Sequence, residues 1–478
     1  MKAMKKSLMM RGMVLMHYGI TVLLFVGCWW LFYRHIAAGA VFGAVNISVY
    51  AFYAVSLLML SRIYSAYRVG LLHVGDLFYG QVLSNLISLG LTYLLACALA
   101  RRLINPLAGF GCAAVQALFS AGWTISANRL YFSLHKPKRT VVIYRDESDL
   151  RKLEEIRFFA ERWSVERTVQ WDEENVHDLP YKKETPGGRS FEAIQKLMRI
   201  MEDYEAVFVS GVSATLRNGI VKYCVEKNKA CYFVPHTGDV IISGAEHIRS
   251  FSVPICRARR SRPAPEYLLL KRAMDIVLSL LAIIVLSPFM ALAALAIWSY
   301  DRGPVLYKQV RLTKDGRLFE ILKLRSMIVD AEKGGARLAG EHDDRITPVG
   351  RIIRAIRFDE LPQLFNILKG DMSIVGPRPE RPEIAEQYRQ ELPALDLRLQ
   401  VKAGLTGYAQ IYGRYNTEPQ DKLKMDLMYI NHASLAEDIK LIFATVRVLF
   451  MRESTQGVAD GQVTAVGDAV EGKRKESA

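Results

Sequence analysis

Several features that would place this chain in a common class are missing from its 478 residues. Its six cysteines form no closely spaced metal-ligand pair, so we interpret them as reduced structural residues. The net charge is +15, yet no basic stretch carries the interleaved aromatic residues of a nucleic-acid module. The first apolar run is too long for a cleavable signal peptide and has no small-residue cleavage site. The excess positive charge is therefore better explained by a membrane surface and an anionic nucleotide substrate.

Long apolar runs dominate the N-terminal part of the chain. The sequence is 51% hydrophobic and 23% charged, which predicts a protein that is part membrane and part globular. Four charge-free runs each approach the ~20 residues that cross a bilayer as a helix: 14–32, 41–60, 77–100 and 107–125. Lysine and arginine are concentrated before the first run, in the second loop and after the fourth run. By the positive-inside rule, the N-terminus and everything after residue 129 lie in the cytoplasm.

The composition becomes globular between residues 136 and 257. Strand-like runs at 140–144, 206–209 and 230–234 are separated by helical stretches, which predicts a small α/β domain with a parallel sheet. The turn after the first of these strands lacks the glycines that a dinucleotide phosphate needs. We therefore expect a degenerate, Rossmann-like nucleotide fold that binds nothing or regulates.

A fifth charge-free run, 276–300, is also long enough to span a bilayer. Both of its flanks are basic, whereas a spanning helix would place one basic flank outside. Ser287 and Pro288 lie at its middle, where proline bends a helix and the serine hydroxyl can satisfy a freed carbonyl. We therefore expect a re-entrant membrane helix. The alternative is a fifth crossing with an ordinary proline kink, which would place the following residues outside, away from cytoplasmic nucleotides.

Two adjacent carboxylates, Asp359 and Glu360, precede a short predicted helix in which Pro362 occupies the first turn and Gly370 ends the helix. The spacing predicts an apolar helical face made of Leu361, Leu364, Phe365 and Leu368. A carboxylate or a phosphate group is stabilised at the positive end of a helix. The pair is therefore either a site of phosphate chemistry or, in the alternative, an ordinary helix cap at Asp359.

Six short motifs follow one another in the C-terminal half: Lys271-Arg-Ala-Met-Asp275, Ser287-Pro288, Gly303-Pro-Val-Leu-Tyr-Lys-Gln309, Lys323-Leu-Arg-Ser-Met327, Asp359-Glu-Leu-Pro-Gln363 and Gly376-Pro-Arg-Pro379. Together they resemble the bacterial sugar transferases that attach a sugar-1-phosphate to polyprenyl phosphate, the monotopic phosphoglycosyltransferase superfamily. The match covers residues 271–450. With the N-terminal crossings and the α/β domain, the chain looks like the large branch of that family, which initiates capsule, exopolysaccharide or O-antigen assembly.

The resemblance implies specific roles for the carboxylate pair. Asp359 would be the nucleophile and a magnesium ligand, attacking the β-phosphate of a UDP-sugar, releasing UMP and forming an aspartyl-phosphosugar intermediate. Splitting the transfer in two lets the soluble donor and undecaprenyl phosphate occupy the site in turn. Glu360 would support the metal or handle a proton.

The resemblance also implies which residues contact the substrates. Arg378, fixed between two prolines, is the first candidate to neutralise phosphate charge bidentately, and Lys323, Arg325 and Arg354 follow by motif position. Arg357 stands where many relatives carry a small hydroxyl residue and is a further candidate for substrate contact. Other residues in matching segments are expected either to line the donor pocket or to pack and cap: Gln363, Asn366, Glu380, Lys402, Thr406, Tyr408 and Gln410.

We therefore predict a bacterial inner-membrane enzyme that transfers a hexose-1-phosphate, from UDP-glucose or UDP-galactose, with magnesium as cofactor and its catalytic domain on the cytoplasmic face. The predicted parts are a four-helix transmembrane domain (1–135), a cytoplasmic α/β domain (136–257), a linker with the re-entrant helix (258–302), an α+β catalytic domain (303–452) and a disordered tail (453–478). A homodimer through the α/β domain is compatible with the sequence, which does not demand it.

Two other functions were weighed. A membrane-bound nucleotide-sugar dehydratase or epimerase would suit Tyr267 and Lys271, which have the spacing of the short-chain reductase pair, but the glycine-rich turn that it needs is missing. A noncatalytic subunit of the polysaccharide-assembly machinery would not need the intact carboxylate pair and the Pro-Arg-Pro segment.

Overall fold

The computed structural model of the protein divides into two compact units, Met1–Pro235 and His236–Ala478, each with its own core. The structure describes residues 2–33, 43–153, 160–171, 195, 197–248, 254–261, 263–329, 331, 343, 345–413 and 417–449. The predicted tail at 453–478 lies outside the described residues.

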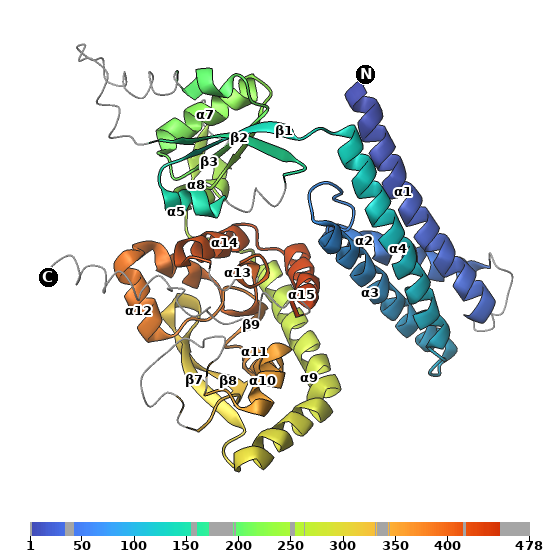
Figure 1. Cartoon of the computed structure of the whole chain (residues 1–478). Coiled ribbons are helices and arrows are strands. Elements are labelled where there is room, and N and C mark those ends of the chain that lie inside the picture. Colours follow the sequence, from blue (N-terminus) through green and yellow to red (C-terminus); the bar gives the residue numbers. More distant parts are fainter. Residues whose placement is uncertain are drawn as a thin grey trace. The chain divides into compact units, whose positions relative to one another are not determined.

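The first unit begins with long apolar helices (Figure 1). The four predicted runs are confirmed as helical in the described residues, and they lie in α1 (Lys2–Cys28), α2 (Ala44–Ile63), α3 (Val74–Ala100) and α4 (Leu107–Leu134). The first helix continues into a π-helical turn, Trp29–Tyr33. All four helices are long and apolar enough to cross a membrane, as is α9 (Pro265–Asp301) further along the chain.

Polar side chains connect the helices of this bundle. Gln116 of α4 donates from Nε2 to the hydroxyl of Tyr53 in α2 at 2.9 Å. Thr124 of α4 donates to Oε1 of Gln81 in α3, also at 2.9 Å. Hydrogen bonds between helices are a recognised source of association in a bilayer, where burial of apolar side chains contributes little. The interior of the bundle thus suits a membrane protein.

A four-stranded parallel sheet follows the bundle, with the strand order β2-β1-β3-β4. Its strands are β1 (Lys138–Tyr144), β2 (Trp163–Gln170), β3 (Ala206–Ser210) and β4 (Ala230–Phe233), and its helices include α5 (Glu147–Lys152) and α7 (Ala214–Glu226). The predicted parallel sheet is confirmed. Strand β2 was not predicted from the sequence; its first three residues are partly buried, and most of the rest are exposed.

Acidic side chains lie where a phosphate would bind in an open parallel sheet, at the carboxyl ends of β1 and β3, where the strand order reverses. The carboxylate of Asp146 caps α5 by accepting from the backbone N–H of Asp149 at 3.0 Å. The carboxylate of Asp149 in turn accepts from the hydroxyl of Ser210 at 3.3 Å. Two carboxylates at this edge repel a phosphate group.

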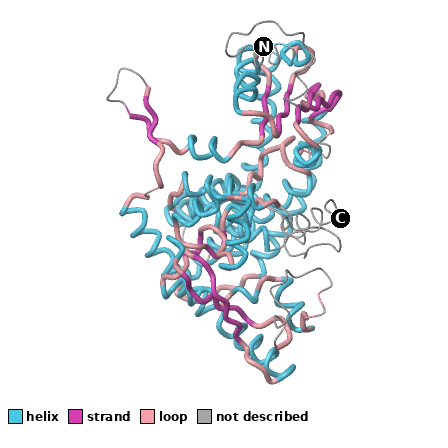
Figure 2. Tube along the Cα trace, turned by 90° about the vertical axis from the view of Figure 1, so that its left-hand side faces the viewer, coloured by secondary structure: helices cyan, strands magenta, loops and turns pink. Residues whose placement is uncertain are grey.

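The second unit contains α9 and a compact α+β domain (Figure 2). Its described strands pair two by two: β5 (Glu246–Ile248) with β6 (Ile255–Arg257), β7 (Leu306–Leu312) with β8 (Leu318–Leu324), and β9 (Ser373–Val375) with β10 (Gly404–Thr406). Only the last of these pairs is parallel. The other helical segments are α8 (Thr237–Ser243), η4 (Lys314–Gly316), α10 (Pro348–Ala355), η5 (Phe358–Glu360), α11 (Gln363–Lys369), α12 (Pro382–Glu391), η6 (Pro393–Gln400), α13 (Tyr408–Ile411), α14 (Pro419–Asn431) and α15 (Leu435–Leu449).

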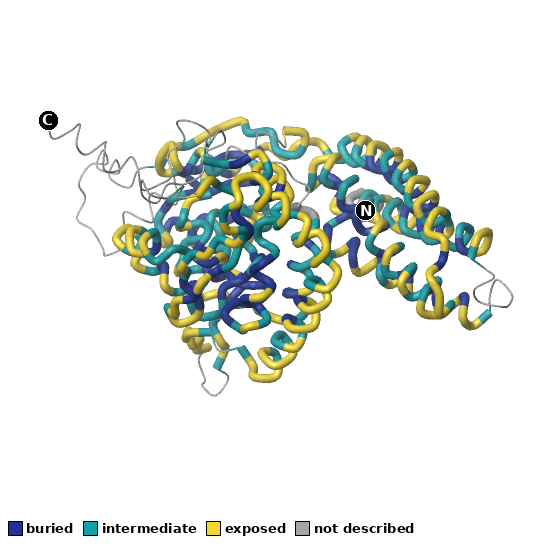
Figure 3. The backbone as a smooth tube through the Cα atoms, turned by 90° about the horizontal axis from the view of Figure 1, so that it is seen from below, coloured by how far each residue is buried: buried dark blue, intermediate teal, exposed yellow. Residues whose placement is uncertain are grey.

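The core of this unit joins segments that are distant in the sequence. Ile367 of α11, Met372 beside β9, Leu423 and Leu427 of α14, and Leu441 of α15 are each no more than 2% exposed. Figure 3 shows buried backbone segments in the interior of the unit, with exposed helices around them. This packing fixes α11 and β9, the two elements next to the catalytic motifs.

The middle of α9 bends, as the sequence predicts. Figure 1 shows the helix changing direction part-way along its length. Pro288 has no N–H, and the carbonyl of Ile284 that would have accepted from it accepts instead from the hydroxyl of Ser287 at 3.0 Å. The serine thus compensates the hydrogen bond that the proline removes.

Both arms of α9 pack on the same compact unit. In the first arm, the guanidinium of Arg272 donates to the carbonyls of Ile367 and Leu368 at 2.6 and 2.7 Å. In the second arm, Ile297 is 4% exposed and packs against Leu324 of β8. A straight helix of these 37 residues would extend about 55 Å, so the bend keeps both arms on one body. Between the arms, four apolar side chains are 57–65% exposed: Ile284, Val285, Phe289 and Leu292.

Candidate active site

The carboxylate pair, Asp359 and Glu360, lies in the 3-10 turn η5, directly before α11. Leu364 of α11 is 5% exposed and faces the core, as the sequence predicts. One position of the predicted apolar face is wrong, because Phe365 is 45% exposed and Ile367 is buried instead. The short helix is turned slightly from its predicted orientation, with the pair still at its N-terminal side.

Two cations hold Glu360. Its Oε1 accepts from Nζ of Lys323 at 3.0 Å and from Nη2 of Arg378 at 3.1 Å, and its side chain is 12% exposed. Burial by itself would raise the pKa of Glu360, but the charges of Lys323, Arg378 and Arg357 outweigh burial and hold this pKa below its usual range. Glu360 is therefore an anion whose charge is already neutralised.

Asp359 is in a different state. Its carboxylate makes no hydrogen bond or ion pair with any residue in the described part of the chain. Burial raises the pKa of Asp359, with Glu360 adding to the shift and with Lys323 and Arg354 opposing it. The pair thus consists of one clamped carboxylate and one that is available to a ligand.

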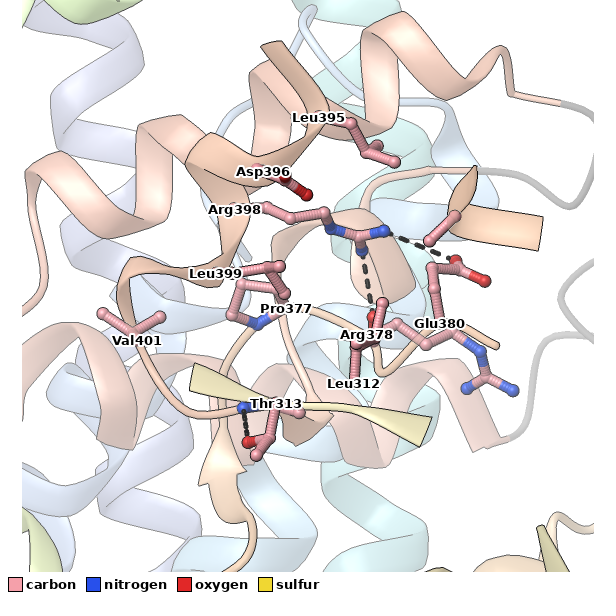
Figure 4. Close-up of a pocket in the computed structure, with 12 residues that line it drawn as sticks. Leu312, Thr313, Pro377, Arg378, Glu380, Leu395, Asp396, Arg398, Leu399 and Val401 are labelled. Atoms are coloured by element: carbon pink, nitrogen blue, oxygen red, sulfur yellow. Dashed lines mark hydrogen bonds and ion pairs between the residues drawn. The ribbon is translucent and has the colours of Figure 1, made fainter. Parts of the chain in front are cut away.

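A buried arginine, Arg398, holds the backbone of the Pro-Arg-Pro segment (Figure 4). Nη2 of Arg398 donates to the backbone carbonyl of Arg378 at 3.0 Å, and Nη1 lies 3.5 Å from the carboxylate of Glu380. Asp426 lies 2.8 Å from the same guanidinium and is 1% exposed. These contacts fix the backbone of Arg378, whose own guanidinium extends to Glu360.

A fully buried carboxylate, Asp438, joins the first arm of α9 to the domain. Its Oδ2 accepts from the hydroxyl of Tyr267 and from Nζ of Lys271, each at 2.8 Å. Its Oδ1 accepts from the hydroxyl of Tyr429 at 2.7 Å, and that hydroxyl lies 3.3 Å from the carbonyl of Val375. The Tyr-Lys spacing therefore reflects a structural contact, which agrees with our interpretation that it does not mark a reductase.

A second carboxylate of α9 holds β9 directly. Asp275 is 3% exposed, and its Oδ1 accepts from the backbone N–H of Ile374 at 3.1 Å. Since β9 leads directly into Gly376-Pro-Arg-Pro379, the base of the apolar helix and the arginine loop belong to one connected framework.

The oxygen ligands at this site suit only one mode of magnesium binding. No group of three or more His, Cys, Asp or Glu side chains that would hold a metal occurs among the described residues. Magnesium often binds through one or two carboxylates, with water and substrate phosphates completing the octahedron. The available oxygens of Asp359 fit that mode, whereas Oε1 of Glu360 is already engaged by two cations.

The C-terminal half of the chain matches known proteins. Residues 266–452 match the family described as bacterial sugar transferase. A putative undecaprenyl-phosphate N-acetylgalactosaminyl 1-phosphate transferase of Bacillus subtilis (strain 168) is 46% identical over 152 residues, which are 32% of this chain and 85% of that relative. The chain belongs to the bacterial sugar transferase family.

Longer relatives match over part of their length. The chain is 42% identical over 190 residues to the UDP-N-acetylgalactosamine-undecaprenyl-phosphate N-acetylgalactosaminephosphotransferase of Aeromonas hydrophila, covering 39% of this chain and 45% of the relative. It is 35% identical over 280 residues to the UDP-glucose:undecaprenyl-phosphate glucose-1-phosphate transferase of Escherichia coli (strain K12), covering 56% and 60%. The chain thus spans about half the length of these relatives. The predicted family is confirmed.

Within this sugar transferase domain, the predicted site residues divide into two groups. Lys323 and Arg378 contact the carboxylate pair, and Arg354 and Arg357 lie close enough to shift its pKa values. Arg357 precedes the turn in the left-handed region at φ 53°. Gln363, in the first turn of α11, is 3% exposed.

Other predicted residues are engaged in packing. The guanidinium of Arg325 is 7% exposed and forms a two-bonded ion pair with Asp301, the last residue of α9. The amide of Asn366 accepts from the N–H of Leu322 at 3.0 Å and donates to the carbonyl of Glu320 at 2.7 Å. Both residues therefore join secondary elements, and neither contacts the carboxylate pair.

Neither Lys402 nor Gln410 contacts the carboxylate pair within the described part of the chain. Nζ of Lys402 and the guanidinium of Arg272 both come within 3.7 Å of the point where a β-carbon on Gly370 would lie. That point is at the far end of α11, about 10 Å along the helix from the carboxylate pair. Both amide atoms of Gln410 are buried and have no hydrogen-bond partner among the described residues.

Arg398, Asp426 and Asp438 were not predicted from the sequence. One signal was available for Asp426, since it lies on the same helical face as Leu423, Leu427 and Ile430. A carboxylate on an apolar face requires a buried cationic partner. The partner itself, Arg398, had no local pattern that would identify it.

Proposed function

We propose that this protein transfers a hexose-1-phosphate from a UDP-sugar to undecaprenyl phosphate and releases UMP, the first membrane step of capsule, exopolysaccharide or O-antigen assembly. The observation that carries the proposal is the contrast within the carboxylate pair, in which Glu360 is clamped by two cations and Asp359 is available. The names of two relatives include a UDP-sugar and undecaprenyl phosphate, which supports these substrates.

In the first step, a carboxylate oxygen of Asp359 attacks the β-phosphorus of the UDP-sugar. The bond between that phosphorus and the bridging oxygen breaks, and UMP leaves with the oxygen and its electron pair. Arg378 and Lys323 lie beside Asp359 and balance negative charge on the transferred group. The product is an acyl phosphate that joins the sugar phosphate to Asp359.

In the second step, a phosphate oxygen of undecaprenyl phosphate attacks the same phosphorus. The bond to the carboxylate of Asp359 breaks, and the sugar leaves on a diphosphate linked to the lipid. Both displacements exchange one phosphorus–oxygen bond for another, so neither needs a redox partner. Because the two substrates use the nucleophile in turn, the site need not hold both at once.

Magnesium would be held by Asp359 together with the phosphates of the donor, which suits its preference for few protein ligands. When bound, it would supply positive charge to the phosphate oxygens and favour the anionic form of Asp359, whose pKa is raised by burial. Glu360 would position Arg378 and Lys323 around the donor.

The membrane arrangement forms part of the proposal. With four crossings, and with basic residues before the first run and after the fourth, the N-terminus, the N-terminal sheet and the catalytic domain would all lie on the cytoplasmic side of a bacterial inner membrane. The bend at Pro288, the packing of both arms on one domain and the exposed apolar side chains between them support a re-entrant α9. The N-terminal sheet would then be a degenerate Rossmann-like domain without a nucleotide, and a homodimer through it stays a prediction.

The test is transfer by the purified full-length protein with radiolabelled UDP-sugars, magnesium and undecaprenyl phosphate, comparing wild type with Asp359→Asn. A matched control is Asp315→Asn, since that side chain is 60% exposed and distant in sequence from the pair. We expect UMP release and label in the lipid phase for wild type and control, and a loss of at least about 10⁴-fold for Asp359→Asn. Glucose and galactose are the first sugars to try. Equal rates in all three proteins would remove Asp359 from the chemistry, and no UMP from any sugar would favour a noncatalytic subunit.

A further inference from the structure

A cavity of about 550 Å³ opens at one end of the N-terminal bundle, where α1, the loop between α2 and α3, and the end of α4 meet. This volume lies in the range of small-molecule sites. Its lining comes entirely from the first unit, so it takes no part in the carboxylate site described above. Nothing in the proposed transfer reaction uses it.

Specific contacts hold the walls of this cavity in place. The loop lies directly against the ring of Tyr131, because Gly70 has φ +74° and a β-carbon there would fall 2.1 Å from that ring. The guanidinium of Arg162 donates to the carbonyl of Gly70 at 2.7 Å and fixes the loop from its other side. The hydroxyl of Tyr67 lies 3.3 Å from Nδ1 of His17. The cavity is therefore a built feature of the fold.

The chemistry of the lining combines an apolar interior with one permanent cation. Val14 and Leu15 of α1 and Val69 of the loop supply apolar surface, and Tyr67 and Tyr131 add aromatic rings with polar tips. Tyrosines of this kind are typical of the boundary between lipid and water. The cavity thus has the character of a site for an amphiphile.

Arg11 is the cation of this cavity, and it makes no hydrogen bond or ion pair within the described part of the chain. It lies only three residues inside the apolar span that begins at Leu8, so it sits near the membrane surface. A guanidinium at that depth is best satisfied by a phosphate, which it binds through two parallel hydrogen bonds. On the proposed orientation, this end of the bundle faces the cytoplasmic leaflet, which carries anionic lipids.

We propose that this cavity binds one anionic phospholipid from the cytoplasmic leaflet, whose phosphodiester headgroup has a net charge of −1, as in phosphatidylglycerol. The phosphate lies on Arg11, and an acyl chain lies along Val14, Leu15 and Val69. A phosphodiester carries a single negative charge, which one arginine balances, whereas a phosphate monoester such as undecaprenyl phosphate carries more. The inference rests on the membrane orientation given under the proposed function and on none of its chemistry.

The test counts lipid on the purified full-length protein by native mass spectrometry during titration with phosphatidylglycerol or phosphatidylcholine. We expect wild type to retain one phosphatidylglycerol with at least about tenfold preference, and Arg11→Gln to lose that preference. Arg102→Gln is the matched control, because Arg102 is exposed at the opposite end of the bundle. Val14→Phe, which fills the cavity without changing charge, is expected to lower retention of both lipids.

Three outcomes would overturn the inference. Equal retention of phosphatidylglycerol by wild type and Arg11→Gln would remove the role of the arginine. An equal loss in Arg102→Gln would indicate a general charge effect. Displacement of the bound phospholipid by an equimolar amount of undecaprenyl phosphate would assign the cavity to a different lipid. UMP release by the same wild-type sample is measured in parallel, so lipid retention without transfer would fault the proposed function alone.

Discussion

Replacing Glu360 by glutamine distinguishes two roles for the second carboxylate of the pair. In the structure, its Oε1 is shared between Lys323 and Arg378 at 3.0 and 3.1 Å, which makes Glu360 a positioning residue for two cations. If Glu360 also moved a proton in the reaction, Glu360→Gln would slow the reaction independently of Arg378. A double-mutant cycle of Glu360→Gln and Arg378→Gln separates these possibilities.

The expected magnitudes follow from the contacts. Removing one preorganised donor to a developing negative charge typically costs 10²–10³ in rate, or about 3–4 kcal/mol, so Arg378→Gln is expected to lower kcat/KM by about that factor. Glu360→Gln leaves Arg378 without its anionic partner, and we expect a similar loss of about 10²-fold. Because Glu360→Gln acts partly through Arg378, the loss in the double variant should be smaller than the product of the two single losses, and any loss beyond that of Arg378→Gln is the share that Lys323 carries.

The assay is initial-rate UMP release by the full-length protein in lipid, with thermal unfolding of each variant recorded alongside. Glu383→Gln is the matched control, because its side chain is 68% exposed and its nearest cation is 3.9 Å away. Losses that multiply in the double variant would refute the positioning role and favour independent proton transfer by Glu360. A variant that unfolds at the assay temperature is replaced by Glu360→Asp, which retains the charge.

Three further predictions concern the framework and the cofactor. Asp438→Asn leaves the buried ammonium of Lys271 without its anionic partner. We therefore expect the domain to lose about 3–5 kcal/mol of stability, measured as a lower Tm in detergent. An unchanged Tm would contradict a stabilising role of this ion pair. Gly376→Ala places a β-carbon 2.3 Å from the carbonyl oxygen of Lys402 and should shift the arginine loop, lowering kcat/KM by about 100-fold, whereas Gly238→Ala, with open space around it, should have no effect. EDTA should abolish UMP release and excess magnesium should restore it; activity that persists in EDTA would remove the metal from the site.

Local patterns made much of the fold predictable. The length of the apolar runs was enough to predict the helices of the bundle. The Ser287-Pro288 pair was enough to predict the bend in α9, because the missing N–H of proline weakens any helix in the same way. Gly370 ends α11 as expected, with φ 97°. The missed strand β2 has a weaker pattern, since none of its residues is fully buried and its burial does not alternate along the strand.

Long-range partners were not predictable from one sequence. Motif position placed Lys323 and Arg378 at the pair, but the same reasoning placed Arg325 there, and its guanidinium is instead bound to Asp301. Lys271 and Asp438 are separated by 167 positions, so no spacing rule connects them. Which carboxylate a cation meets is decided by tertiary packing, which a local pattern does not contain.

The two-armed packing of α9 bears on how the catalytic unit can be isolated. A fragment that begins at Pro265 would keep the four apolar side chains around Pro288 that are 57–65% exposed, namely Ile284, Val285, Phe289 and Leu292. Deleting these residues would disconnect the two arms of α9, of which one contacts α11 and the other packs on β8. With α9 re-entrant as proposed, proteolysis of the linker before this helix would release no soluble enzyme, and the proposed transfer would stay at the bilayer without the preceding domains.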